Sequence, residues 1–293
     1  MRSLVINIYI NFKNVISYFF KICGGLFSAV IAILTFFPWN DIGGVTICDR
    51  VLFFIAIIIV SLIIAVLIIT FKNTNVIWEQ GGGKISIIYG DILKLGFPKQ
   101  NVEKRIIVIP VNTHFDTIVD ECISEVDKPL VSIKSIHGQW LKKICIDIKS
   151  EKLNAIIHDD LKSQNVQSDM DGDRSRGNTR EYPIGTIAVV SGKNNVEFFL
   201  LALTKFDDNN NAQGSNDYFF EALRKLIGVY NRRGQGYPLY IPIMGTRLSR
   251  SGLSHADALN KIISILQLER DQIHGSINIV IYDEDRDKVS IWQ

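Results

Sequence analysis

The stretch Ile106-Ile-Val-Ile-Pro-Val-Asn-Thr-His-Phe-Asp-Thr117 carries the clearest structural signal in the chain. Its apolar, β-branched first half is typical of a buried strand, and the small polar residues after Pro110 predict a loop. Apolar residues then recur every three or four positions from Phe115 to Val126, which predicts an amphipathic helix with Thr113 as its N-cap and Asp116 in its first turn. We therefore expect a strand, a loop and a helix in succession.

Two further strands end in loops of the same kind. The segment 85–89 runs into Gly90-Asp91, and the segment 240–244 runs into Gly245. In a mostly parallel α/β sheet, ligands bind beyond the carboxyl ends of the strands. We therefore expect these two loops and the loop after Asn112 to meet at one edge of the sheet.

Strands and helices alternate through most of the remaining sequence. Strand patterns cover 185–191, 196–204, 239–243 and 276–282, while helical patterns follow the polar run 207–216 and the cap residue Ser254. Residues 165–181 are polar and rich in Gly, Ser and Asp, which indicates a mobile insertion or lid. The alternation predicts an α/β fold in the form of a three-layer α/β/α sandwich.

Two apolar runs near the N-terminus predict a transmembrane hairpin. Residues 51–71 contain only Ser61 and Thr70 as polar interruptions, and a first span covers about 18–37. The predicted organisation is a hairpin over 1–72, a flexible linker over 73–84 that includes three consecutive glycines, and a ligand-binding domain over 85–293. Basic residues flank the outer ends of the two spans, so the positive-inside rule places both termini of this two-pass protein in the cytoplasm.

Charge and cysteine content exclude several other classes of site. The formal net charge is +2 with no basic stripe, which argues against a nucleic-acid partner. The four cysteines show no metal-ligand spacing, and no nucleophile elbow surrounds the serines near His255. We therefore expect no metal and no hydrolase triad.

The loop 245–254 is the strongest candidate for an anion site. It lies between a predicted strand and a predicted helix N-terminus, where backbone amides and the helix dipole favour an anion. Its glycines permit close backbone approach, and its arginines neutralise phosphate. The combination suits a diphosphate, although two solvated arginines in a surface loop are the alternative. The candidate residues are Gly245, Thr246, Arg247, Ser249, Arg250 and Gly252.

These motifs together resemble those of a macro domain, the ADP-ribose-binding α/β/α module. Gly90-Asp-Ile92 ends one strand, Val108-Ile-Pro-Val-Asn112 lies on the next, and a Gly-rich loop precedes a late helix. More closely, the segments 110–117, 136–139, 182–186 and 245–254, behind two membrane helices, resemble the membrane-anchored effectors of type II Thoeris antiphage defence, the ThsA family. The likeness covers the whole architecture, and residues 85–283 by motif.

The resemblance implies a macro-domain-like sandwich behind a transmembrane hairpin, acting in antiphage defence. A TIR-domain partner enzyme would consume NAD and release an ADP-ribose derivative, histidine-ADP-ribose in these systems. The macro domain would bind this signal, and the chain would then assemble into a homo-oligomer in the bacterial inner membrane and disrupt the lipid. The resemblance implies a ligand but no cofactor.

Individual residues take roles by the same resemblance. Asp91 would accept a hydrogen bond from the adenine amino group, with Ile92 beside it. The loop 245–252 would hold the diphosphate. The distal ribose would be lined by Asn112, Thr113, Asp116 and Thr117.

One departure from the pattern bears on catalysis. Hydrolytic macro domains carry a second Asn and a Gly-rich stretch with a catalytic Asp after the position of Asn112, whereas Thr113-His-Phe-Asp-Thr117 follows here. The departure favours binding without turnover, so we predict a protein that is not an enzyme. Two alternatives stay open: a membrane-tethered hydrolase of ADP-ribose conjugates, and a non-catalytic membrane scaffold that docks a protein through 165–181.

Overall fold

The computed structural model describes residues 2–39, 45–122, 126–172, 174–206, 212–213, 215–245 and 254–292. The chain divides into two compact units. One contains Met1–Asn73 together with Val289–Gln293, and the other contains Thr74–Lys288.

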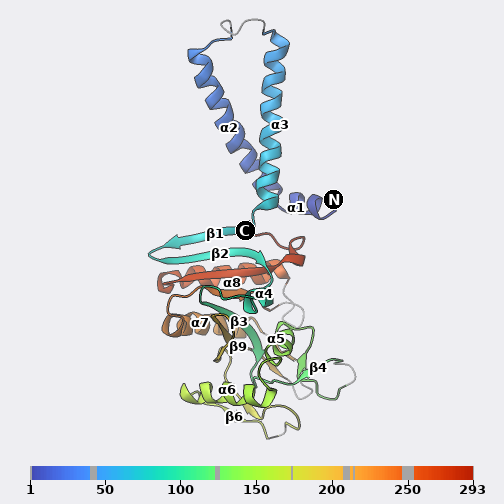
Figure 1. Cartoon of the computed structure of the whole chain (residues 1–293), viewed down its shortest axis with the longest axis vertical. Helices are drawn as coiled ribbons and strands as arrows, with labels where there is room; N and C mark the ends of the chain where they lie inside the picture. The colour runs from blue at the N-terminus through green and yellow to red at the C-terminus, as the bar shows by residue number, and fades with distance from the viewer. Residues whose placement is uncertain are drawn as a thin grey trace. The chain divides into compact units, whose positions relative to one another are not determined.

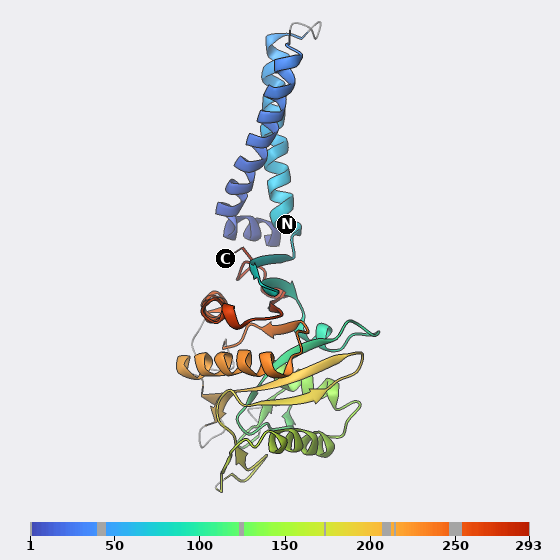
Figure 2. The same cartoon turned by 90° about the vertical axis from the view of Figure 1, so that its left-hand side faces the viewer.

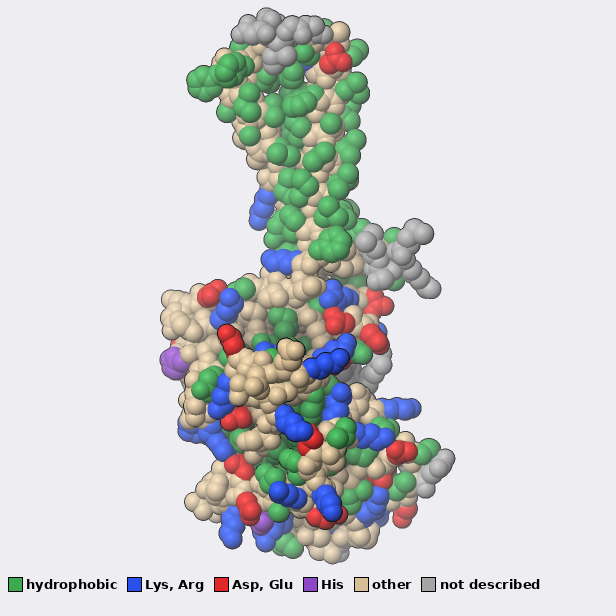
Figure 3. Space-filling model, in the orientation of Figure 1, with side chains coloured by type: hydrophobic (Ala, Val, Ile, Leu, Met, Phe, Trp, Pro, Cys, Tyr) green, Lys and Arg blue, Asp and Glu red, His purple; other side chains and the backbone are tan. Residues whose placement is uncertain are grey.

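The first unit is a helical hairpin. A short helix α1 (Arg2–Ile10) precedes α2 (Phe12–Phe36) and α3 (Ile47–Phe71), and the two long helices are apolar enough to cross a membrane. Thr46 caps α3 through a reciprocal pair of hydrogen bonds with Asp49. Hydrophobic side chains cover much of the surface of these helices (Figure 3), as expected where lipid rather than water is the solvent. Both predicted spans are therefore helical, and each helix starts several residues earlier than predicted.

The second unit is built on a mixed sheet (Figure 1) whose strand order is β1-β2-β12-β11-β3-β9-β10, with β8 also paired to β9. The central strands β2, β12, β11, β3 and β9 are parallel, and the strands at both margins are antiparallel. The strands are β1 (Thr74–Gln80), β2 (Gly83–Gly90), β3 (Arg105–Asn112), β8 (Ile187–Ser191), β9 (Val196–Phe206), β10 (Ala212–Gln213), β11 (Leu239–Pro242) and β12 (Ser276–Tyr282).

Helices cover both faces of this sheet, which confirms the three-layer sandwich. Figure 2 shows α6 on one side of the strands and α7 on the other. Because side chains alternate along a buried strand, Ile107 and Ile109 of β3 join the core beneath α5 and α6, whereas Ile106 and Val108 are equally buried on the opposite face. The helices are α4 (Ile92–Gly96), α5 (Ile136–Ile144), α6 (Ser150–Ser163), α7 (Asn216–Arg233) and α8 (His255–Leu268), with short 3-10 turns η3 (Arg270–Gln272) and η4 (Asp283–Asp285).

Two segments differ from the sequence predictions. Residues 73–84, predicted as a flexible linker, contain β1, which pairs with β2 across a tight turn. Gly81 and Gly82 have φ of +59° and +86°, so these glycines serve a two-residue hairpin turn rather than flexibility.

The predicted helix after Phe115 is wrong. Residues 113–118 form a turn, followed by the small parallel pair of β4 (Val119–Asp120) and β5 (Val131–Ser132). Phe115 has φ of +54°, which a right-handed helix does not permit. The Asn112 side chain also accepts hydrogen bonds from the amides of His114 and Asp116, so those amides are bound in a turn.

Candidate functional site

The carboxyl ends of the parallel strands meet at one edge of the sheet, as the sequence predicted. Along this edge Tyr282 of β12 lies in register with Gly90 of β2, and Asn112 of β3 lies in register with Thr204 of β9. Gly245 follows β11 with φ of +82°, in the left-handed region that favours glycine. The edge therefore brings together the loops after β2, β3 and β11.

Asp91 lies at this edge as the N-cap of the short helix α4. Its Oδ1 accepts from the amides of Leu93 at 2.8 Å and Lys94 at 3.2 Å. Its Oδ2 lies 4.0 Å from the Lys94 ammonium group, which is largely in solvent. Ile92 is buried in the core behind it. One carboxylate oxygen is thus used to build the loop, and the other faces a weak partner.

Asn112 organises the turn after β3. Besides the two amides that its oxygen binds, its Nδ2 donates to Asp116 Oδ2 at 2.9 Å. Only 4% of Asn112 is exposed. Buried polar atoms need partners, and here the Asn112 side chain meets that need by shaping the 112–116 turn.

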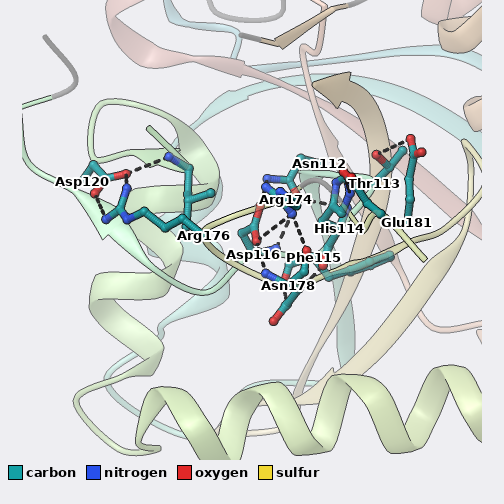
Figure 4. Close-up of polar contacts among 12 residues, drawn as sticks. Asn112, Thr113, His114, Phe115, Asp116, Asp120, Arg174, Arg176, Asn178 and Glu181 are labelled. Carbon is teal, nitrogen blue, oxygen red and sulfur yellow. Dashed lines mark hydrogen bonds and ion pairs between the residues drawn. The ribbon is translucent and has the colours of Figure 1, made fainter. Parts of the chain in front are cut away.

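Asp116 is the centre of a buried polar cluster (Figure 4). Arg174 from the insertion donates to this carboxylate from both terminal guanidinium nitrogens, from Nη2 to Oδ2 at 2.6 Å and from Nη1 to Oδ1 at 3.2 Å. The Asn178 backbone amide donates to Oδ1 at 2.9 Å. Gly177, with φ of +84°, permits this approach, because a Cβ at that position would lie 2.4 Å from Asp116 Oδ1. The carboxylate is fully buried and accepts four hydrogen bonds in total, including the one from Asn112.

A second ion pair joins the same insertion to β4. Arg176 donates to Asp120 from Nη1 to Oδ2 at 2.9 Å and from Nη2 to Oδ1 at 2.5 Å. The Leu130 backbone amide donates to Oδ2 of the same carboxylate at 2.7 Å. Burial opposes ionisation of Asp120, but the hydrogen bonds from Arg176 and Leu130 and the charge of Arg176 outweigh it and hold the pKa of Asp120 below its usual value. The insertion 165–181 is therefore fastened at two points, and its ends pair as the short strands β6 (Asp169–Met170) and β7 (Arg180–Glu181).

The two predicted threonines point into the protein. Thr113 Oγ1 donates to Glu181 at 3.2 Å, and its amide donates to the Thr204 carbonyl at 2.9 Å. Thr117 Oγ1 accepts from the Ser150 hydroxyl at 3.1 Å. Both residues are buried, so in this structure they hold the turn in place between β9 and α6.

A cavity of about 330 Å³ opens beside this turn, between α6 and the insertion. His114 lines it and is 4% exposed, and its Nε2 lies 3.4 Å from an Asp171 carboxylate oxygen. Burial, with a further contribution from the charge of Arg174, lowers the pKa of His114. The other lining residues are Phe115, Asn154, Ala155, Ile157, His158, Leu161, Asn178, Thr179, Arg180 and Tyr182.

The remaining predicted residues of the diphosphate loop, Thr246, Arg247, Ser249, Arg250 and Gly252, lie outside the described residues. The end of that loop is described. Ser254 caps α8 by accepting from the Asp257 amide at 3.1 Å, as predicted, and His255 Nε2 lies 3.5 Å from Asp285 in η4.

The domain that carries the strand edge, the Asn112 turn and the glycine after β11 matches one family of proteins by its sequence. Residues 85–282 match the family model described as Thoeris protein ThsA, Macro domain. The chain belongs to the ThsA macro-domain family. A relative described as Thoeris protein ThsA from Bacillus amyloliquefaciens (strain Y2) is 23% identical over 252 residues, which cover 82% of this chain and 77% of that protein.

Solved macrodomain structures are similar at lower identity. An asparagine-to-alanine mutant of the Oceanobacillus iheyensis macrodomain matches with a TM-score of 0.46 and 12% identity, covering 73% of this chain and 88% of that one. A glycine-to-valine mutant of the same macrodomain, solved with ADPR, matches with a TM-score of 0.42 and 11% identity, covering 73% and 92% of the two chains.

Sequence reasoning missed two residues that the insertion contributes to this ThsA-family domain and one residue of the turn after β3. Arg174, Asn178 and His114 all lie within the polar cluster or the cavity beside it. The available signal was an insertion that contains arginines and a glycine, together with two acids spaced four apart after β3, Asp116 and Asp120. Spacing alone did not reveal it, because the partners lie 56 to 62 positions apart in the sequence.

Proposed function

We propose that this protein is a membrane-anchored antiphage effector whose macro domain binds histidine-ADP-ribose, an ADP-ribose derivative made by a TIR-domain partner enzyme. Binding then drives self-assembly in the bacterial inner membrane and disruption of the lipid. The hairpin crosses the membrane twice, with both termini in the cytoplasm. The observation that carries this proposal is the convergence of Asp91, the Asn112 turn and Gly245 at one sheet edge of a ThsA-family domain whose chain also holds two membrane-length helices.

Asp91 supports recognition of the adenine end. Its Oδ1 is committed to capping α4, while its Oδ2 lies 4.0 Å from the largely solvated Lys94 ammonium group. That oxygen remains able to accept a hydrogen bond from an exocyclic amino group. Ile92, buried directly behind it, supplies the apolar floor on which a base rests.

The turn 112–117 supports the distal-ribose end in a less direct way than the sequence suggested. Asn112 and Asp116 use their side chains on each other, on turn amides and on Arg174. We infer that these two residues fix the turn that the ribose contacts, and that Thr113 and Thr117 anchor it from beneath.

The same cluster favours binding over turnover. A general base must be free to take a proton from its substrate. Asp116 accepts four hydrogen bonds in a fully buried site, two of them from a guanidinium. Such a carboxylate is poorly placed to activate water, and we therefore propose a sensor rather than a hydrolase.

Calorimetric titration of the full chain in lipid nanodiscs with ADP-ribose and with histidine-ADP-ribose tests the proposal. Asp91→Asn is the informative variant, because asparagine caps a helix as well as aspartate does but lacks the anionic acceptor. We expect affinity to fall roughly ten-fold, the equivalent of about 1.4 kcal/mol. Lys94→Ala is the matched control and should bind normally. The proposal would be refuted if the unmodified protein bound neither ADP-ribose nor histidine-ADP-ribose.

A further inference from the structure

The last described residues of the chain, Val289–Trp292, group with the helical hairpin rather than with the sheet domain. Val289, Ser290 and Ile291 are almost completely buried, with exposures of 1%, 6% and 0%. The chain thus leaves the hairpin unit after Asn73 and returns to it at Val289. The sheet domain is joined to the hairpin unit by both of its ends.

The returning segment supplies a hydrogen bond to a buried amide at the start of α2. Asn11 is 1% exposed, and its Nδ2 donates to the backbone and side-chain oxygens of Asn7 at 2.9 and 2.6 Å. The Ser290 hydroxyl donates to Asn11 Oδ1 and itself accepts from the Trp292 amide at 2.9 Å. Without Ser290, the carbonyl oxygen of Asn11 would lose this hydrogen bond in a buried position.

Trp292 then touches both long helices. Its ring meets Tyr18 of α2 edge-on at 5.4 Å, and its carbonyl accepts from Asn14 Nδ2 at 3.4 Å. Lys72 is the C-cap residue of α3, and its ammonium group lies 4.5 Å from the centre of the same ring. Trp292 therefore bridges the start of α2 and the end of α3.

Beneath Trp292 lies a small apolar cluster made of Val15 from α2 with Ala65 and Ile69 from α3. These are the buried apolar residues of the described hairpin. Farther along, the rings of Phe27 in α2 and Phe54 in α3 stack with their centroids 5.3 Å apart. Among the described residues, the buried apolar side chains of the hairpin therefore lie at the end that Trp292 packs against.

A short segment links this contact to the candidate ligand edge. Tyr282 at the end of β12 pairs with Gly90, the residue before Asp91. Asp285 contacts His255 at the start of α8, and the Arg286 guanidinium lies 4.3 Å over the Tyr89 ring. Only residues 283–288 separate β12 from Val289.

We propose that Val289–Trp292, here called the clasp, holds the start of α2 against the end of α3. Residues 283–288 couple this clasp to the ligand edge. The clasp itself is independent of any ligand. Only the coupling rests on the proposed function.

Disulfide trapping in membranes containing the full chain tests the clasp. With the four native cysteines replaced by serine, one protein carries Val15→Cys and Ile69→Cys, and a matched control carries Phe27→Cys and Phe54→Cys. We expect Trp292→Ala and Ser290→Ala each to lower the yield of the 15–69 disulfide several-fold and to leave the 27–54 disulfide unchanged. Trp292→Phe keeps an aromatic ring against Tyr18 and should restore most of the 15–69 yield.

An unchanged 15–69 yield in Trp292→Ala would overturn the clasp. A loss of both disulfides that Trp292→Phe does not correct would also overturn it, because the segment would then support folding in general rather than this contact. Disulfides that run mostly between chains would contradict a clasp made within one chain.

The coupling is tested by adding ADP-ribose or histidine-ADP-ribose, in separate samples, to the same membranes and measuring both nucleotide binding and the 15–69 yield. Binding accompanied by a changed yield supports the coupling, provided that Asp91→Asn weakens both. Binding without any change in yield refutes the coupling and leaves the sensor function intact. Absence of binding to both nucleotides refutes the proposed function and with it the coupling, while the trapping result for the clasp stands.

Discussion

The insertion places two arginines on two aspartates that follow β3, and the two ion pairs differ in burial. The Arg174 and Asp116 side chains are 4% and 0% exposed, whereas those of Arg176 and Asp120 are 32% and 4% exposed. A buried pair is costly to form, but losing one partner is still more costly because a charge is left alone in a medium of low polarity. A pair open to water loses little when it is broken.

The comparison separates two tasks within one insertion. The Arg174 pair lies under the turn that begins at Asn112, at the candidate ligand edge. The Arg176 pair joins the insertion to β4, which follows that turn in the sequence. The first pair fixes the shape of the candidate site, and the second holds the insertion against the domain.

Asp116→Ala is the sharpest way to break the buried pair. It leaves Arg174 buried without its carboxylate, so we expect the free energy of unfolding to fall by about 3–5 kcal/mol. Chemical denaturation of the full chain in detergent, followed by tryptophan fluorescence, measures the loss. The double variant Asp116→Leu with Arg174→Met removes both charges and should recover much of it; a double variant as unstable as the single one would show that packing, not the charge, causes the effect.

The sequence was sufficient for the central strands of the sheet and for the longer helices because their signals are local. The run 276–282 has the boundaries of β12, and Ser254 caps α8. The edge at which ligands would bind also followed from the sequence, since parallel strands place their carboxyl ends together.

The turn after β3 was not predictable in the same way. The apolar period from Phe115 onward imitates a helix, but the Asn112 side chain binds the amides of His114 and Asp116. Asp116 was expected in the first turn of a helix, and it instead binds Arg174, a residue 58 positions away. The helical periodicity was overridden by the hydrogen bonds of the Asn112 side chain and by the contact with Arg174, which no short window of sequence contains.

Lowering the pH gives a further test of the comparison between the two ion pairs, because a neutral histidine, His114, lies beside the buried pair. Burial and the charge of Arg174 lower the pKa of His114 below its ordinary 6.5. As the pH falls through that value, the unfolded chain takes up a proton before the folded one does, so the stability that His114 contributes at neutral pH is progressively lost.

We expect the free energy of unfolding to decline less steeply between pH 7.5 and about pH 5 in His114→Gln than in the unmodified protein. His137, whose pKa burial lowers to about 3, destabilises both proteins in the same direction and cancels in the difference. Parallel denaturation curves across this range check the expectation; equal slopes would mean that His114 becomes protonated in the folded domain as readily as in the unfolded chain.

Arg176→Ala should have the smallest effect, about 1 kcal/mol, because Arg176 is partly in water and Asp120 keeps its hydrogen bond from the Leu130 amide. The pKa of Asp120 is below 3.8 in the folded protein, so the contribution of the pair is complete above that value and is lost as the pH falls through the folded pKa. The difference between Arg176→Ala and the unmodified protein should therefore shrink at acid pH and at high salt. Denaturation series in both conditions measure this. If Arg176→Ala destabilised the domain as much as Asp116→Ala does, burial would not be what separates the two pairs, and the Arg176 contact would have to hold the candidate site as firmly as Arg174 does.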